Sequence, residues 1–176
     1  MPMVSNPPDY MRRLSPHIFY NDVGRALDWL SEAFGFTVEV RMTDQEDFVV
    51  HGEVSYKECL ILLGLALEKP FWRTPQELNG MISQRLYIYV DDVDAHAEQA
   101  RRAGAEIVGE PSDQFHGDRA YECRDLEGHH WKFAQHLFDV DMKNLQRPDW
   151  AQAKMKEARL SNLAITRPEL ILPSNP

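Results

Sequence analysis

The chain has 176 residues, of which 43% are hydrophobic and 10% aromatic, and its formal net charge at pH 7 is -9. This length and composition suit one globular domain with a buried core, and they exclude a chain that is disordered throughout. The acidic charge argues against nucleic acid and against a membrane surface as partners, because both attract clustered Lys and Arg.

Membrane and compartment signals are also lacking in the sequence. No segment approaches the roughly 20 apolar residues that cross a bilayer, and residues 1–13 do not contain the apolar stretch of a signal peptide. We therefore expect a cytoplasmic protein. Cys59 and Cys123 are the two cysteines, and each lies within an expected strand, which favours buried free thiols over a disulfide or a cysteine-based zinc site.

The first half of the chain predicts one βαβββ unit. Residues 1–13 contain three prolines and are expected to form an irregular arm. Asp22 stands at a helix N-cap position, apolar residues recur at helical spacing as far as Phe34, and Gly35 ends the pattern. The expected strands of this unit cover residues 14–20, 36–42, 47–54 and 57–63.

The second half repeats this order. Asp22-Val23 recurs 70 residues later as Asp92-Val93, and self-similarity at a fixed spacing indicates two copies of one unit. We therefore expect a domain over residues 14–137, with module 1 at about 14–67, a connector at 68–84 and module 2 at about 85–137. Within module 2 we expect a helix from Asp92 to about residue 103 and strands over 85–90, 106–109, 119–124 and 129–134.

Residues 138–176 form an extension beyond the repeat. Pro148-Asp149 is expected to open a helix that continues to about residue 160. Residues 168–173 are apolar and lack a helix signal, so we expect an extended arm that packs on its own domain or on a second subunit.

These two units resemble the vicinal oxygen chelate superfamily, which contains glyoxalases, bleomycin-resistance proteins and extradiol dioxygenases. The resemblance covers residues 14–135, although Leu126 replaces the proline that is usual in the last turn. It implies an α+β fold in which two tandem βαβββ modules form an eight-stranded half-barrel cup around a pocket, and it implies a homodimer. It rests on Pro16, Asp22, Ala26, Phe34-Gly35, Gly117-Asp118-Arg119, Asp125, Gly128 and Trp131.

Metal-dependent members of this superfamily bind a divalent ion at four positions, which in this chain hold Ser15, Ile61, Arg85 and Lys132. Isoleucine has no lone pair, and Arg and charged Lys only donate hydrogen bonds, so these residues do not form a ligand set. We therefore expect no metal and no other cofactor. An atypical histidine site is the alternative, and the only two histidines expected to share the cup are His17 and His130.

The cup wall follows from strand alternation, which places every second residue on one face. We expect Cys59, Ile61 and Leu63 to line the wall in module 1, with His130, Lys132 and Ala134 in module 2. Trp72, between two prolines of the connector, is either a lid over the ligand or a seal between the modules. The candidate ligand-binding residues are His17, Phe19, Trp72, Arg85, Tyr87, Tyr89, His130 and Lys132.

Arg85 and Lys132 among aromatic rings suit an aromatic or carboxylate-bearing small molecule, unless Glu58 or Glu122 neutralises them. No nucleophile elbow, phosphate loop or dinucleotide motif is present, so catalytic residues cannot be named. The favoured function is metal-independent binding of such a compound for sequestration or resistance, without catalysis. Two alternatives stay open: a glyoxalase-like lyase, isomerase or dioxygenase with an atypical metal site, and a structural or regulatory dimer that acts through residues 138–176.

Overall fold

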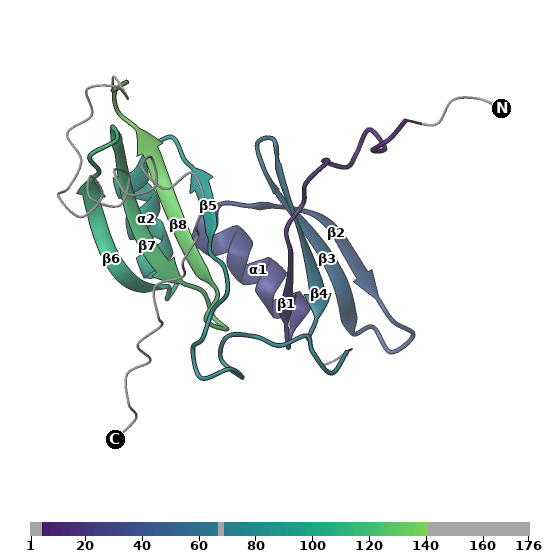
Figure 1. Ribbon diagram of the computed structural model, residues 1–176. Helices are drawn as coiled ribbons and strands as arrows, with labels where there is room; N and C mark the ends of the chain where they lie inside the picture. Colours follow the sequence, from purple (N-terminus) through teal and green to yellow (C-terminus); the bar gives the residue numbers. More distant parts are fainter. Residues whose placement is uncertain (1–4, 67–68, 141–176) are drawn as a thin grey trace, which may run out of the picture.

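The computed structural model describes residues 5–66 and 69–140, and within them the chain forms two βαβββ modules side by side (Figure 1). Each module has its own four-stranded sheet, ordered β1-β4-β3-β2 in module 1 and β5-β8-β7-β6 in module 2. The elements are β1 (His17–Tyr20), α1 (Val23–Phe34), β2 (Thr37–Thr43), β3 (Val49–Tyr56), β4 (Cys59–Leu65), β5 (Leu86–Tyr89), α2 (Val93–Arg102), β6 (Glu106–Asp113), β7 (Asp118–Arg124) and β8 (His130–His136).

The predicted α+β fold of two tandem modules is confirmed, with both sheets left open as half-barrels. The predicted C-terminal helix and extended arm lie outside the described residues. In the part of the chain that the structure describes, neither helix is long and apolar enough to cross a membrane.

Local sequence signals explain where the helices begin and end. The Asp22 side chain accepts a hydrogen bond from the Arg25 amide at the start of α1, and the Asp92 side chain does the same for Ala95 at the start of α2. Gly35 adopts φ 68° directly after α1, a left-handed conformation that glycine reaches without a steric penalty. Both caps match the positions that the sequence predicts.

The repeat extends to strand register. In module 1, β1 runs parallel to β4 with His17 opposite Leu62, and in module 2, β5 runs parallel to β8 with Tyr87 opposite Lys132. Both residues of the second pair lie 70 positions after those of the first. The position equivalent to Lys132 is therefore Leu62.

The predicted facing of β4 is wrong by one residue. Ile61 and Leu63 are 4% and 0% exposed and belong to the hydrophobic core, whereas Leu62 and Gly64 pair with His17 and Phe19 on the opposite face. The stretch Cys-Leu-Ile-Leu-Leu-Gly-Leu has almost no polar residue to mark a face, so its pattern does not fix its orientation. Cys59, Ile61 and Leu63 consequently do not line the open face.

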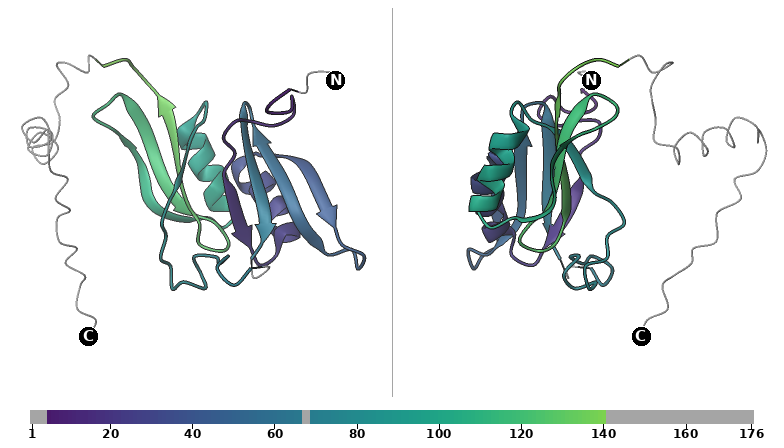
Figure 2. Two further views of the ribbon diagram at one scale, coloured as in Figure 1. Left: turned by 45° about the vertical axis from the view of Figure 1, so that its right-hand side comes forward. Right: turned by 90° about the vertical axis from the view of Figure 1, so that its left-hand side faces the viewer.

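Both helices lie on one side of the two sheets, and within residues 5–66 and 69–140 no helix covers the other face of either sheet, which we call the uncovered face (Figure 2). The helices contact each other, and the core continues from one module into the next through aromatic rings such as Phe34 and Phe133, whose centroids are 4.7 Å apart. His96 is buried in this region, where its Nδ1 lies 2.7 Å from the Tyr121 hydroxyl and its Nε2 lies 3.2 Å from the Phe34 carbonyl oxygen. Burial lowers the pKa of His96, so the ring is neutral.

The turn between β7 and β8 forms a polar joint between the modules. The Tyr20 hydroxyl, at the end of β1, donates to Asp125 Oδ2 at 2.6 Å. The backbone amides of Asn21 and Asp22 donate to the Glu127 carboxylate. Both carboxylates are buried, so this turn fixes how module 2 sits against the start of α1. The sequence predicts the turn but gives no sign of the joint.

Candidate functional site

The uncovered faces carry the predicted ligand-binding residues in two groups. We call His17, Phe19 and Trp72 the aromatic half-site, because they lie together on module 1 and the connector. We call Arg85, Tyr87, Tyr89, His130 and Lys132 the basic half-site, because they lie on or beside β5 and β8 of module 2.

The aromatic half-site is a stack of rings over the edge of module 1. The Trp72 ring is stacked on that of Phe19, with centroids 4.4 Å apart and planes inclined by 16°. The His17 ring lies 4.8 Å from Phe19, centroid to centroid. Gly64 leaves room for these rings, since a Cβ atom there would lie only 2.6 Å from His17 Nε2. Trp72 thus packs on module 1, and the lid and the seal both stay predictions.

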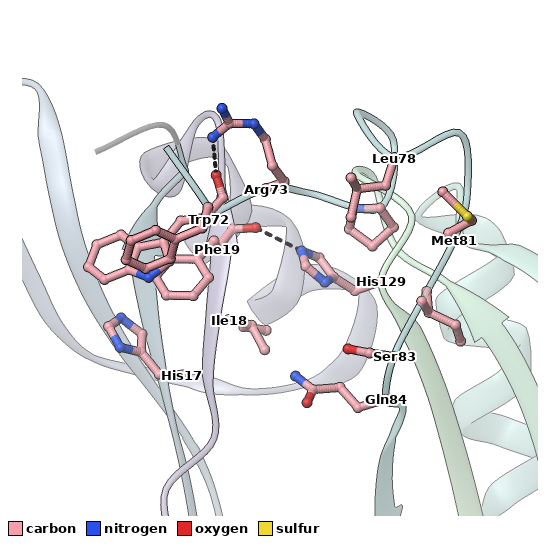
Figure 3. A pocket seen from close by; sticks show the side chains of 13 residues that line it. His17, Ile18, Phe19, Trp72, Arg73, Leu78, Met81, Ser83, Gln84 and His129 are labelled. Carbon is pink, nitrogen blue, oxygen red and sulfur yellow. Dashed lines mark hydrogen bonds between the residues drawn. The ribbon is translucent and has the colours of Figure 1, made fainter. Parts of the chain in front are cut away.

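A pocket of about 290 Å³ opens beside this stack. Figure 3 shows the aromatic pair on one side, with Leu78 and Met81 of the connector on the opposite side. Ser83 and Gln84 add polar groups to the lining. Arg73, His17 and His129 also line the pocket, so its wall is nearly as polar as it is apolar. Small-molecule sites combine apolar walls with polar groups, and this pocket is at the lower end of their usual size.

The ring of His129 also reaches this pocket. Its Nε2 donates a hydrogen bond of 2.8 Å to the Phe19 carbonyl oxygen, and its backbone amide donates to Asp125. His129 therefore connects the modular joint to the strand that carries the aromatic half-site. The sequence marked its neighbour His130 as the ligand-binding histidine and did not assign this role to His129.

The basic half-site contains an internal carboxylate. Glu122 Oε1 accepts hydrogen bonds from Arg85 Nη1 at 2.7 Å and from Lys132 Nζ at 3.0 Å. Burial alone would raise the pKa of Glu122. The hydrogen bond and charge of Lys132 and the charge of Arg85 outweigh burial, so the pKa is lowered overall. Glu122 is one of the two carboxylates that the sequence suggested as neutralising partners. It offsets one of the two positive charges, and one remains.

The aromatic residues of the basic half-site lie beside this charge. Lys132 Nζ lies 6.0 Å from the centroid of the Tyr87 ring, at the outer limit of a cation–π contact. The Tyr87 and Tyr89 rings are 5.5 Å apart and both are partly exposed on the open face. The combination of flat rings and a residual positive charge is chemically suited to an aromatic carboxylate.

His130 is held as a neutral ring. Arg124 Nε donates a hydrogen bond of 2.7 Å to His130 Nε2. Burial, followed by the charge of Arg124, lowers the pKa of His130. His17 and His130 lie on different sheets, in β1 and β8.

Sequence reasoning missed Asp118. Asp118 and Arg119 are adjacent in β7, and adjacent strand residues face opposite sides, so they do not pair with each other. Arg119 instead pairs with Asp94 and Asp113, while Asp118 is buried on the other face among hydroxyl and imidazole groups. In the sequence, the only sign of this role for Asp118 was that Tyr and His residues stand at alternate positions of the strands that become its neighbours.

The cysteines differ in their surroundings. Cys123 is buried, and burial raises the pKa of its thiol to about 12, so it is not a reactive thiolate. Cys59 is exposed, which corrects the expectation that both thiols are buried. Its position at the start of β4 explains the difference, because this end of the strand extends beyond the core.

The four positions at which related proteins hold a metal do not fit one here. With the register corrected, they are Ser15, Leu62, Arg85 and Lys132. A leucine and two cationic side chains offer no lone pairs to a divalent ion. Across residues 5–66 and 69–140, no group of three or more His, Cys, Asp or Glu residues is arranged to hold a metal ion.

Two βαβββ modules with open sheets and a pocket beside the first strand define a class of duplicated, half-barrel proteins. Comparison of the sequence with protein families gives the family itself. The Glyoxalase/Bleomycin resistance protein/Dioxygenase superfamily matches residues 11–133. The chain belongs to this superfamily.

Individual proteins are similar to this chain in sequence or in structure. An uncharacterized protein of Mycobacterium bovis is 29% identical over 136 residues, which cover 76% of this chain and 89% of the relative. The crystal structure of TioX from Micromonospora sp. ML1 has 28% identity and a TM-score of 0.57, with 72% of this chain and all of TioX covered. A glyoxalase-related enzyme from Clostridium phytofermentans shares the fold at 17% identity, with a TM-score of 0.55 and coverage of 72% and 96%.

Proposed function

We propose that this protein binds a small aromatic or carboxylate-bearing compound without a metal, as a sequestration or resistance protein of its superfamily. The observation that carries the proposal is the pocket of about 290 Å³ between the Phe19–Trp72 stack and the connector. A planar ring in this pocket would contact the aromatic pair on one side and apolar connector side chains on the other. Ser83 and Gln84 would supply hydrogen bonds to polar substituents.

The basic half-site supports the carboxylate part of the proposal. Two cations share one oxygen of Glu122, so the cluster retains a positive charge that a ligand carboxylate can offset. The guanidinium of Arg85 has further N–H groups beyond the one that Glu122 accepts, and these suit a planar anion. We propose that aromatic carboxylates bind more tightly than the corresponding neutral or cationic compounds.

The test is a thermal-shift screen of aromatic acids, amines and neutral analogues against the full chain in excess EDTA. A ligand that binds only the native state raises its apparent stability. For the best compound, calorimetric titration of Trp72→Ala should show affinity reduced about tenfold, since an aromatic contact contributes up to about 1.5 kcal/mol beyond its buried area. Phe48→Ala is the control, because Phe48 is an exposed aromatic residue of module 1 that does not line the pocket. Equal affinity in the two variants would refute this site.

The proposal includes a homodimer in the cytoplasm. Neither sheet closes on itself, and the uncovered faces carry exposed apolar or aromatic side chains, including Met42, Tyr87 and Tyr89. A second copy would cover these faces and could bring the two half-sites around one ligand. Sedimentation equilibrium of the full chain should give twice the monomer mass at micromolar concentration, and a monomer at all concentrations would exclude the dimer.

A further inference from the structure

One buried carboxylate stands at the centre of a polar cluster on the open face of module 2. Asp118, the first residue of β7, is only 2% exposed. Its Oδ2 accepts hydrogen bonds from the Tyr87 and Tyr89 hydroxyls at 2.9 and 2.7 Å, and His116 Nε2 lies 3.2 Å from the same oxygen. Its Oδ1 accepts from His136 Nδ1 at 2.8 Å. We call these five residues the Asp118 cluster.

The geometry of this cluster determines how the two tyrosines lie. Their rings are 41% and 54% exposed, so they are on the surface. Exposed tyrosines usually direct the hydroxyl to water, but here both hydroxyls reach the same buried oxygen. This arrangement fixes the orientation of the two rings, which lie 5.5 Å apart with planes inclined by 57°, and it leaves ring surface open to a ligand.

Protonation states agree with this role. Burial acts to raise the pKa of Asp118, but hydrogen bonds from His136, Tyr89 and Tyr87 lower it overall. The pKa of Tyr87 is raised by burial and by the hydrogen bond to Asp118, and that of Tyr89 mainly by its hydrogen bond to Asp118. At neutral pH the cluster therefore holds a carboxylate and two neutral phenols, which is the combination that keeps both hydrogen bonds.

We propose that Asp118 is a positioning residue that holds Tyr87 and Tyr89 as a preorganised aromatic wall for the ligand of the basic half-site. This inference rests on the proposed function, because it assigns the wall to the same ligand. Asp118 itself does not need to touch the ligand. It acts by removing rotamer freedom from two side chains before binding, which reduces the entropy cost of association.

The first experiment measures the two phenols without any ligand. Alkaline titration of the full chain, followed by the absorbance of ionised tyrosine, should show that Asp118→Asn lowers the pH at which two phenols ionise. The pKa of Tyr89 should fall closer to its ordinary value of about 10 than that of Tyr87, because burial also raises the pKa of Tyr87. Asp113→Ala is the control, because Asp113 is an exposed carboxylate of the same module that pairs with Arg119. An unchanged tyrosine titration in Asp118→Asn would overturn the proposal.

The second experiment uses 2-naphthoate as the probe. Asp118→Asn should weaken its binding about tenfold, because the two tyrosine side chains must then be immobilised when the ligand binds. Tyr87→Phe with Tyr89→Phe should weaken it similarly. If Asp118→Asn does not fold, this double variant decides the question, since it keeps both rings and Asp118. Affinity equal to that of the wild type in the double variant would overturn the positioning role.

The two experiments separate the two claims. If wild-type protein does not bind 2-naphthoate or any other aromatic acid, the proposed function fails. In that case a change of the tyrosine titration in Asp118→Asn would still show that Asp118 holds the two hydroxyls. The aromatic wall would then exist, but aromatic acids would not be its ligands. If binding is normal but the titration does not change, the inference about Asp118 fails and the proposed function stands.

Discussion

Replacement of Asp125 by alanine tests the polar joint between the modules. Asp125 Oδ2 accepts from the Tyr20 hydroxyl at 2.6 Å and from Trp131 Nε1 at 3.0 Å, while Oδ1 accepts from the backbone amides of Glu127 and His129. Tyr20 and Trp131 are 0% and 1% exposed, so in Asp125→Ala their donors would be buried without a partner. Each orphaned donor costs about 1–3 kcal/mol, and the two together predict a loss of about 2–6 kcal/mol.

The assay is urea unfolding followed by circular dichroism. With a slope of about 2 kcal/mol per molar urea, the predicted loss lowers the midpoint by about 1–3 M. Tyr20→Phe removes only one donor and leaves the carboxylate with three, so it should lose less than half as much. Asp91→Ala is a surface control, since Asp91 pairs with the exposed Lys57, and its midpoint should not change. A loss below about 1 kcal/mol in Asp125→Ala would refute the view that this joint stabilises the fold.

Two further predictions concern protonation and charge. Burial lowers the pKa of His96 in the folded state, so the stability that its neutral form contributes is complete above the unfolded pKa of about 6.5 and falls as the pH decreases below that value. Between pH 7.5 and pH 5, the thermal unfolding temperature should therefore fall further in the wild type than in His96→Gln. An equal fall in both proteins would contradict this prediction. For 2-naphthoate, calorimetry should show weaker binding in Arg85→Ala and tighter binding in Glu122→Gln, because the second change removes the carboxylate that competes for Arg85. A change in the same direction for both variants would contradict an anion site.

The duplicated scaffold could be predicted because its signals are local. Asp22 and Asp92 cap their helices, Gly35 ends the first, and strand alternation is legible wherever polar and apolar residues alternate. In β4 almost every residue is apolar. The face of each side chain there was decided by the register with β1, in which His17 lies opposite Leu62, rather than by any pattern in β4.

The missed features depend on contacts between distant segments. Glu127 meets the start of α1 across 105 residues of chain. Asp118 reaches Tyr87 across 31 residues. Each is an ordinary carboxylate in the sequence, and only the packing of strands and modules identifies its partners. The sequence could therefore name the residues of the basic half-site and suggest Glu122 as a partner of its cations, but it could not assign the roles of Asp118 and Glu127.

The central claim is that a small aromatic ligand binds beside Trp72 without a metal. The most direct measurement is an NMR titration of ¹⁵N-labelled full-length protein in excess EDTA with the best compound from the screen, with the Trp72 indole signal assigned from Trp72→Phe. We predict a saturable shift of the Trp72 indole signal, while those of Trp29 and Trp131, which do not line the pocket, change little. Binding that requires an added divalent metal, or saturation without a shift at Trp72, would contradict the account.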